Sequence, residues 1–440
     1  MHIAMIGGGY VGLVSGACFA EFGSDVSVVE TNAERLKSLR SGCMPIYEPG
    51  LDRLVAANQS AGRLRFTDDL KEALIGAEAV FIAVGTPARR GDGHADLSYV
   101  YAAAEQVGRT LRDYAVIVTK STVPVGTSRR IAEIVRDSAP NLDFDVASNP
   151  EFLREGSAIS DFMRPDRVVI GAESDRARDV LRRLYRPLYL IEAPIVFTGI
   201  ETAELTKYAA NAFLAMKVTF INEMADLCEK AGADIHDVAR GIGLDGRIGR
   251  KFLHPGPGFG GSCFPKDTLA LVRIAQDFAA PTRLVETVVN VNEARKSSMA
   301  QRIIGAAGGS VRGKTVAVLG LTFKPETDDM RDSPSLPIIS RLVGDGADIR
   351  AYDPQGMEQA RPMLPENVEY CQSAMDAAKG ADILVVITEW NEFRALDPRQ
   401  LRSAMRGRIV VDLRNIYEPA AMHGAGIAYY SVGRPAVGVS

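Results

Sequence analysis

The stretch that decides the fold is Ile3-Ala4-Met5-Ile6-Gly7-Gly8-Gly9-Tyr10-Val11-Gly12. Four apolar residues predict a buried strand, and the Gly-x-Gly-x-x-Gly pattern after them predicts a tight turn that opens a helix. Gly7 permits the turn, Gly9 lets the backbone approach a pyrophosphate, and Gly12 lets the helix pack closely on the strand. The stretch therefore predicts a dinucleotide-binding unit, with the anion at the helix N-terminus.

An acidic residue ends the next predicted strand. Glu30 follows Val26-Ser27-Val28-Val29, about where a carboxylate binds the hydroxyls of an adenosine ribose. A carboxylate there would repel a 2′-phosphate, which favours NAD over NADP. Arg35 lies close by in the sequence and leaves that choice open.

Short apolar runs alternate with helical patterns up to about residue 195, which predicts βαβ units on a parallel sheet. These runs are 3–6, 26–29, 79–84, 115–119, 144–147 and 168–170. Strand-like runs resume at 315–320, 348–352, 382–388 and 408–412.

Between these two regions the pattern is helical. Residues 201–231 contain neither Pro nor Gly and predict one long helix, and a second long helix is predicted over about 282–307. The predicted fold is therefore α/β: two Rossmann-like doubly wound domains joined by a central helical domain with a long helix. We expect an NAD-binding domain at 1–198, a helical dimerisation domain at 199–308 and a second Rossmann-like domain at 309–440.

Composition excludes several classes of protein. Hydrophobic residues at 46% and charged residues at 24% are ordinary for a globular chain and argue against a long disordered or fibrous protein. The net charge of −4 argues against a general binder of nucleic acid or membrane surfaces. Because the first strand begins at once and no long apolar run is present, we expect a cytoplasmic protein.

Five cysteines, Cys18, Cys43, Cys228, Cys263 and Cys371, are scattered without a Cys-x-x-Cys pair, so neither a disulfide framework nor a metal site is indicated. Cys263 differs from the other four because it lies in a loop rich in proline and glycine, Pro255 to Asp267. A helix is predicted to begin near Pro265, which places Cys263 at a helix N-terminus beside Lys266, a setting that favours the thiolate. Cys263 is therefore a candidate nucleophile, and the other four are interpreted as packing residues.

Three further groups of residues are candidates for chemistry. Lys207 and Asn211 are four apart on the long helix, and form either an exposed polar stripe or a buried pair that stabilises an oxyanion. The loop Asn149 to Gly156 follows a strand, where open α/β folds bind ligands, and contains Glu151 and Glu155. The segment Lys120 to Thr127 supplies hydroxyl and amide groups of the kind that bind phosphate.

These motifs resemble those of the UDP-glucose/GDP-mannose dehydrogenase family over essentially the whole chain. The matching stretches are 7–12, 47–51, 84–87, 120–127, 149–156, the helix with Lys207 and Asn211, 258–267 and 322–335. The resemblance implies an NAD-dependent four-electron oxidation of a primary alcohol to a carboxylate, with UDP-glucose converted to UDP-glucuronate for nucleotide-sugar and polysaccharide metabolism. Phe264, where GDP-mannose enzymes usually have leucine, favours the UDP-glucose branch.

The resemblance also implies roles for individual residues. Cys263 would form a thiohemiacetal and then a thioester, and the other implied catalytic residues are Lys207, Asn211, Asp267, Thr122 and Glu151. The implied NAD-binding residues are Gly7, Gly9, Tyr10, Val11, Gly12, Glu30, Arg35, Thr86, Ser121, Thr122, Glu155, Lys266 and Arg331. The implied substrate-binding residues are Glu151, Phe152, Leu153, Lys207, Asn211, Arg247, Phe252, Phe259, Gly260, Phe264, Lys324 and Arg414. No metal is implied.

Arg247 resembles a residue that the family supplies from a neighbouring subunit, which implies a homodimer or a higher homo-oligomer. The alternative to oxidation of UDP-glucose is the same reaction on another sugar nucleotide such as GDP-mannose. A single-step hydroxyacid dehydrogenase has no use for a cysteine in a loop. A non-catalytic NAD-binding sensor would be expected to lose Cys263, Lys207 or Asp267, and all three are present.

Overall fold

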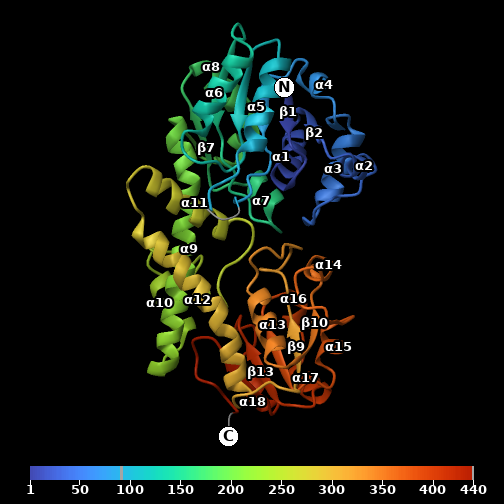
Figure 1. The fold of residues 1–440 in the computed structure, drawn as a ribbon, viewed down its shortest axis with the longest axis vertical. Helices are drawn as coiled ribbons and strands as arrows, with labels where there is room; N and C mark the ends of the chain where they lie inside the picture. The colour runs from blue at the N-terminus through green and yellow to red at the C-terminus, as the bar shows by residue number, and fades with distance from the viewer. Residues whose placement is uncertain (90–92, 439–440) are drawn as a thin grey trace. The chain divides into compact units, whose positions relative to one another are not determined.

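The computed structural model describes residues 1–89 and 93–438, and their contacts group into two compact units (Figure 1). Unit 1 comprises Met1–Ala210 and Arg273–Ala280, and unit 2 comprises Asn211–Val272 and Pro281–Ser440. The predicted division into three domains stays a prediction.

Within the described residues, unit 1 contains an eight-stranded sheet of order β3-β2-β1-β4-β5-β6-β7-β8. The strands are β1 (His2–Ile6), β2 (Asp25–Val29), β3 (Leu64–Thr67), β4 (Ala79–Ile82), β5 (Ala115–Thr119), β6 (Phe144–Ser148), β7 (Val168–Ala172) and β8 (Ile195–Thr198). The chain leaves β1 in one direction and returns to β4 on its other side, so β1 and β4 flank the topological switch point where doubly wound sheets bind ligands.

Helices follow the strands of unit 1 in the order that the sequence pattern predicts. They are α1 (Tyr10–Glu21), α2 (Ala33–Arg40), α3 (Leu51–Ser60), α4 (Leu70–Leu74), α5 (Ser98–Thr110), α6 (Thr127–Ser138), α7 (Ala158–Met163), α8 (Asp175–Leu184) and the short 3₁₀ helix Arg186–Ile191. The sheet departs from the prediction at one place, because β6 and β7 are antiparallel rather than parallel.

The sheet of unit 1 has a hydrophobic core on each face. Ile3 and Met5 belong to one cluster, together with residues of α1, whereas Ala4 and Ile6 belong to another, with residues of α5 and α6. This alternation is the period of two that a strand imposes on its side chains. Burial on both faces explains why the run 3–6 is continuously apolar.

Unit 2 contains a six-stranded parallel sheet among its described residues, of order β11-β10-β9-β12-β13-β14. Its strands are β9 (Thr315–Leu319), β10 (Asp348–Tyr352), β11 (Glu369–Tyr370), β12 (Ile383–Val386), β13 (Ile409–Asp412) and β14 (Ala428–Ser431). Its shorter helices are α10 (Ile235–Gly243), α13 (Ser335–Gly344), α14 (Met357–Ala360), α15 (Ala374–Ala378), α16 (Asn391–Arg394), α17 (Pro398–Ala404) and α18 (Pro419–Gly424).

Three longer helices are α9 (Ile200–Ala231), α11 (Phe264–Asp277) and α12 (Arg283–Ala306). The predicted long helices at 201–231 and about 282–307 are thus confirmed. Ile221 of α9 and Ile303 of α12 share one buried cluster with Val316 and Ile383 of the sheet. In unit 2, therefore, the C-terminal parts of α9 and α12 are held to the sheet by a common core.

The interpretation of the cysteines is correct for three of the four packing residues. Cys18, Cys228 and Cys371 are buried, whereas Cys43 is exposed. Cys43 follows the end of α2 in a turn, and turns of this kind lie at the surface. The packing role predicted for Cys43 is therefore wrong.

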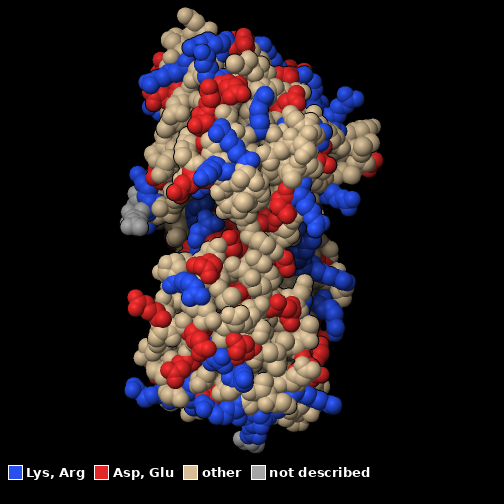
Figure 2. Space-filling view, turned by 90° about the vertical axis from the view of Figure 1, so that its right-hand side faces the viewer, with Lys and Arg blue, Asp and Glu red and all other residues tan. Residues whose placement is uncertain are grey.

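Basic and acidic side chains are interspersed over the face of the molecule shown in Figure 2. No helix in the described part of the chain has the length and apolar character needed to cross a membrane.

The close contact of α1 with β1 gives a first prediction. A Cβ on Gly12 would lie 2.0 Å from the backbone oxygen of Gly7, whereas a Cβ on Gly9 would meet nothing within 4 Å. We expect Gly12→Ala to lower the free energy of unfolding by about 1–3 kcal/mol through overpacking, and Gly9→Ala to leave it within about 0.5 kcal/mol. Urea unfolding of both variants measures this, and equal stability of the two variants would contradict the packing argument.

Candidate active site

The glycine turn between β1 and α1 leaves room for a ligand. Gly7 has φ +110°, and a Cβ there would lie 2.7 Å from the backbone oxygen of Ala83. Gly9 borders open space, and the N-terminus of α1 has no side-chain cap. Backbone N–H groups of an uncapped helix terminus attract an anion, so the turn fits the pyrophosphate of a dinucleotide.

Glu30 lies against this turn. Its side chain is buried, and a Cβ on Gly8 would lie 2.9 Å from Glu30 Oε2. Glu30 Oε1 accepts a hydrogen bond from Asn32 N at 2.8 Å, and Oε2 forms an ion pair with Arg35 at 3.0 Å. In the sequence, Glu30 favours NAD over NADP and Arg35 leaves that choice open. In the structure these two residues therefore form an ion pair with each other.

Tyr10 contacts a buried carboxylate that sequence reasoning missed. The Tyr10 hydroxyl donates to Glu48, which also accepts from Gly156 N at 2.6 Å and Ala158 N at 2.8 Å. Burial and this carboxylate raise the pKa of Tyr10. Glu48 thus links α1 to the end of the loop that carries Glu151 and Glu155.

The loops that follow β4 and β5 are tied to each other. Thr86 Oγ1 donates to the carbonyl of Thr122 at 3.0 Å, and Ser121 Oγ donates to the carbonyl of Val84 at 2.6 Å. Glu204 of α9 accepts from Gly126 N and Ser128 N at 2.7 and 2.8 Å, at the start of α6. The structure thereby brings Thr86, Ser121 and Thr122 together at the carboxyl ends of two neighbouring strands.

A buried ion pair forms the centre of the candidate site in unit 1. Lys207 Nζ lies 3.0 Å from Glu151 Oε1, and both side chains are at least 94% shielded from solvent. Burial acts to raise the pKa of Glu151, but the charge and hydrogen bond of Lys207 and the N–H of Leu153 together lower it. Glu151 is therefore a carboxylate. The Phe152 ring lies beside it, with Lys207 Nζ 5.3 Å and the Arg167 guanidinium 3.6 Å from the ring centroid.

Lys120 is a second buried cation that the sequence did not single out. Its Nζ donates to Asn149 Oδ1 at 3.0 Å, and the Tyr185 hydroxyl donates to the same oxygen at 2.6 Å. Burial lowers the pKa of Lys120 to about 8, with Glu151 raising it and Lys207 lowering it further. These groups line a cavity of about 40 Å³ together with Glu151 and Phe152. A lysine at a strand end gives no local signal of such burial.

In unit 2, Cys263 immediately precedes α11, as predicted. Its carbonyl accepts from Asp267 N at 2.8 Å, in the first turn of the helix, and its Sγ lies 3.5 Å from Ser262 Oγ. The thiol is partly exposed. A cysteine at a helix N-terminus is placed where the helix dipole stabilises a thiolate.

Asp267 is the polar centre next to Cys263. It is 1% exposed, and its two oxygens accept from Asn211 Nδ2 at 2.6 Å and from Lys266 Nζ at 2.5 Å. Lys207 and Asn211 are both buried, so the exposed-stripe alternative for this pair is wrong.

The cysteine loop also packs against residues predicted to bind the sugar nucleotide. A Cβ on Gly256 would lie 3.0 Å from Arg414 Nη1, and Gly261 N donates to the carbonyl of Arg331 at 2.8 Å. Arg414 is itself held by the carbonyls of Ile387 and Phe323 at 2.8 and 3.0 Å. Lys324 Nζ lies 5.3 Å from the centroid of the Phe323 ring.

The aromatic residues of the predicted site form a small cluster. Phe264 lies 6.0 Å from Phe252 and 5.8 Å from Phe259 between ring centroids. A Cβ on Gly260 would lie 2.4 Å from the carbonyl oxygen of Asp332.

The side chains of two predicted residues of unit 2 are exposed and pair with acidic neighbours in the sequence. Arg247 is 90% exposed and pairs with Asp245 in its own loop. Arg331 is 63% exposed and forms a bidentate ion pair with Asp329.

Comparison with known proteins identifies the family. Residues 1–189 match the UDP-glucose/GDP-mannose dehydrogenase family, NAD binding domain, residues 201–294 its central domain, and residues 317–419 its UDP binding domain. The chain belongs to the UDP-glucose/GDP-mannose dehydrogenase family.

Among the relatives is the UDP-glucose 6-dehydrogenase of Rhizobium meliloti, 60% identical over 99% of this chain and 100% of that protein. The UDP-glucose 6-dehydrogenase TuaD of Bacillus subtilis is 47% identical over 99% of this chain and 94% of its own. The solved structure of a UDP-glucose dehydrogenase from Pyrobaculum islandicum has a TM-score of 0.90 at 40% identity and covers 98% of both chains.

Lys120 gives a prediction about pH. Because the pKa of Lys120 falls to about 8 in the folded state, below the value of about 10.4 of a free lysine, the unfolded chain binds more protons in between. The stability that Lys120 contributes should therefore rise with pH, by about 2–3 kcal/mol from pH 8 to 10. We expect the stability difference between the wild type and Lys120→Met to show this rise in urea unfolding, and that between the wild type and the exposed control Lys71→Met to stay constant. A constant difference for Lys120→Met would contradict the assignment.

Proposed function

We propose that this protein oxidises C6 of UDP-glucose twice, with NAD as the oxidant, to give UDP-glucuronate. The observation that carries the proposal is Cys263 at the N-terminus of α11, beside the buried Asn211 and Asp267 and the partly buried Lys266. Full-length similarity to UDP-glucose 6-dehydrogenases supports the substrate. The net reaction takes the alcohol, two NAD⁺ and water to the carboxylate, two NADH and three protons.

The glycine turn and the loops beside it would hold the cofactor. Gly7, Gly9, Tyr10, Val11 and Gly12 would surround the pyrophosphate, and Glu30 with Arg35 would lie at the adenosine ribose. Thr86, Ser121, Thr122, Glu155, Lys266 and Arg331 complete the proposed set. When bound, NAD supplies the hydride acceptor for the oxidation of the alcohol and for that of the thiohemiacetal.

The chain's own groups would do the remaining work. Cys263 would add through Sγ to the aldehyde carbon, so that the aldehyde stays bound as a thiohemiacetal and is then oxidised to a thioester. Hydrolysis breaks the C–S bond, gives the carboxylate and returns the thiol. Lys207 and Asn211 would stabilise negative charge on the C6 oxygen.

Two carboxylates would orient the groups that lose protons in the reaction. Glu151 is ionised beside Lys207, and with Thr122 it would orient the C6 hydroxyl. Asp267 would orient the hydrolytic water, since both of its oxygens are fixed by donors. Glu151, Phe152, Leu153, Lys207, Asn211, Arg247, Phe252, Phe259, Gly260, Phe264, Lys324 and Arg414 form the proposed substrate-binding set.

The first test measures how many NADH molecules form for each sugar consumed. We expect two NADH per UDP-glucose consumed by the wild type, and loss of sustained turnover, by at least a thousandfold, in Cys263→Ala, because no thioester can form. Cys43→Ala is the matched control and should retain full activity, since Cys43 is an exposed cysteine in unit 1. GDP-mannose, assayed in parallel, tests the alternative substrate. One NADH per sugar with free aldehyde as the product would refute the thioester mechanism.

We also propose that the protein is a cytoplasmic homodimer or higher homo-oligomer, with domains at 1–198, 199–308 and 309–440. Phe213, Phe220 and Leu227 recur every seven residues on α9 and are 59, 47 and 57% exposed. Such an apolar stripe favours a helix from a second copy, in a symmetric contact. The exposed Arg247 would then be free to reach a neighbouring subunit.

Phe220 lies in the middle of this stripe. We expect Phe220→Lys to weaken self-association at least tenfold, because a charge would be buried in an apolar contact. Sedimentation velocity across a dilution series measures the change. Met363→Lys, a matched substitution of another exposed apolar residue of unit 2, should leave association unchanged. If both variants associate equally well, the apolar stripe on α9 is not the contact between copies of the chain.

A further inference from the structure

The loop that leads to Cys263 is buried without regular structure. Residues 255–261 are all buried, and none of them lies in a helix or strand. Buried peptide groups need hydrogen-bond partners, and outside a helix or sheet these partners must come from elsewhere. Within the described part of the chain, the only backbone-to-backbone hydrogen bond of these residues is from Gly261 N to the carbonyl of Arg331.

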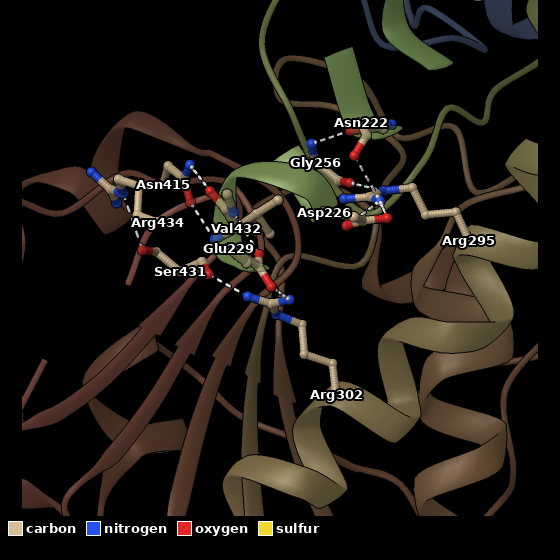
Figure 3. A network of polar contacts seen from close by, with 11 residues as sticks. Asn222, Asp226, Glu229, Gly256, Arg295, Arg302, Asn415, Ser431, Val432 and Arg434 are labelled. Atoms are coloured by element: carbon tan, nitrogen blue, oxygen red, sulfur yellow. Dashed lines mark hydrogen bonds and ion pairs between the residues drawn. The ribbon is translucent and has the colours of Figure 1, made fainter. Parts of the chain in front are cut away.

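Side chains from two helices supply the missing partners. Asn222 of α9 accepts from Gly256 N at 2.8 Å, and Arg295 of α12 donates through Nε to the carbonyl of Gly256 at 2.7 Å (Figure 3). Three residues further along, Asn292 of α12 accepts from Phe259 N at 2.8 Å and donates to the carbonyl of Phe259 at 3.0 Å. The N–H and C=O groups of Gly256 and of Phe259 are thereby both hydrogen-bonded, much as a neighbouring strand would bond them.

Hydrogen bonds, rather than close packing, hold these side chains in place. Asn222, Asn292 and Arg295 are 1, 2 and 7% exposed, yet they line a cavity of about 250 Å³ that also borders Thr219 and Ser298. Arg295 is further oriented by Asp226, whose two oxygens lie 2.9 Å from Nη1. A truncated side chain at 292 would therefore leave polar groups of the loop unsatisfied, with no packed neighbour to take its place.

The loop is confined on more than one side. A Cβ on Gly258 would lie 3.0 Å from Asn292 Oδ1 and 2.9 Å from Lys296 Cγ, so the backbone rests directly on α12. A Cβ on Gly261 would lie 2.6 Å from the Phe323 ring. From Gly261 only Ser262 separates this fixed backbone from Cys263.

We propose that Asn292, Asn222 and Arg295 form a positioning device. They hold the backbone of the loop and thereby fix where Cys263 Sγ lies relative to the carbon that it attacks. None of the three is part of the catalytic or binding set proposed above. The kinetic consequence rests on the proposed function: the first oxidation of the alcohol does not use Sγ, whereas capture of the aldehyde does. Loss of the device should therefore damage the cysteine-dependent steps and spare the first oxidation.

The test uses the full-length protein with Asn292→Ala and Arg295→Lys. Arg295→Lys keeps a cation for Asp226 but loses the Nε donor to Gly256. If Asn292→Ala fails to fold, the kinetics of Arg295→Lys test the proposal instead. Ser298→Ala is the matched control: it lies on the same helix and borders the same cavity, but its hydroxyl donates only to the carbonyl of Arg295.

We expect the cysteine-dependent steps of Asn292→Ala to slow about 10- to 100-fold, because misplacement of a reacting atom by about 1 Å costs that much. Rapid-quench kinetics should show the first NADH formed within about threefold of the wild-type rate, and trapping should reveal free aldehyde with fewer than two NADH per sugar. Ser298→Ala should match the wild type. Equal slowing of both oxidations, or wild-type kinetics in a folded Asn292→Ala, would overturn the proposal.

A second measurement is independent of the substrate. The rate of Cys263 alkylation by iodoacetamide, followed by mass spectrometry of its peptide because Cys43 is also exposed, should change at least threefold in Asn292→Ala and not in Ser298→Ala. If the wild type fails to produce two NADH per UDP-glucose, the proposed function is wrong, while this measurement still decides the positioning role. An unchanged alkylation rate across the pH profile overturns that role.

Discussion

One continuous helix, the 32-residue α9, carries polar side chains that bind several of the loops on which the proposed chemistry depends. In unit 1, Glu204 binds the start of α6 and Lys207 binds Glu151. In unit 2, Asn211 binds Asp267 and Asn222 binds Gly256. Glu204, Asn211 and Asn222 are separated by 7 and 11 positions, which keeps them on one face of a helix with 3.6 residues per turn. Within each unit, α9 therefore fixes the loop residues to which it is hydrogen-bonded.

The opposite face of the same helix has another character. Phe213 lies two positions after Asn211, a rotation of about 200°, and repeats at Phe220 and Leu227. The helix therefore separates its polar contacts with functional loops from an exposed apolar stripe. Both faces of α9 contain apolar residues, so the helix is only weakly amphipathic. The two faces differ in where their polar residues lie.

Burial of charge is the main energetic cost of the site in unit 1. Lys120, Glu151 and Lys207 are all nearly inaccessible, with two cations for one anion. The direct ion pair at 3.0 Å keeps Lys207 and Glu151 charged, whereas Lys120 has amide and hydroxyl partners and its pKa falls to about 8. A buried cation held by neutral groups is costly for stability, and its charge acts on Glu151 beside it.

Local patterns were sufficient to predict the elements and Cys263, but not the contacts between distant residues. The glycine turn, α9, α12 and the placement of Cys263 before α11 each have a signal within a few residues. The short strands β3, β8, β11 and β14 were missed because each contains a polar residue, whereas the equally short β4 and β12 are continuously apolar. Glu48, Lys120 and Asn292 were missed for a different reason. Asn292 meets Phe259 across 33 positions of sequence, and Glu48 meets Gly156 across 108, and no spacing rule encodes such pairs.

The glycines of the cysteine loop are explained by the atoms that a side chain at each position would contact. Side chains on Gly256, Gly258, Gly260 and Gly261 would meet, respectively, Arg414, Lys296, the carbonyl of Asp332 and the Phe323 ring. A loop with no side chains at these four positions lies close to its neighbours, but only Phe259 among residues 255–261 adds an aromatic contact that helps to fix its register. Hydrogen bonds to its peptide groups are therefore an important further means of holding it. The proposed nucleophile would meet the same carbon in capture, oxidation and hydrolysis, and it would need such a fixed backbone because misplacement of a reacting atom by about 1 Å slows a step up to about 100-fold.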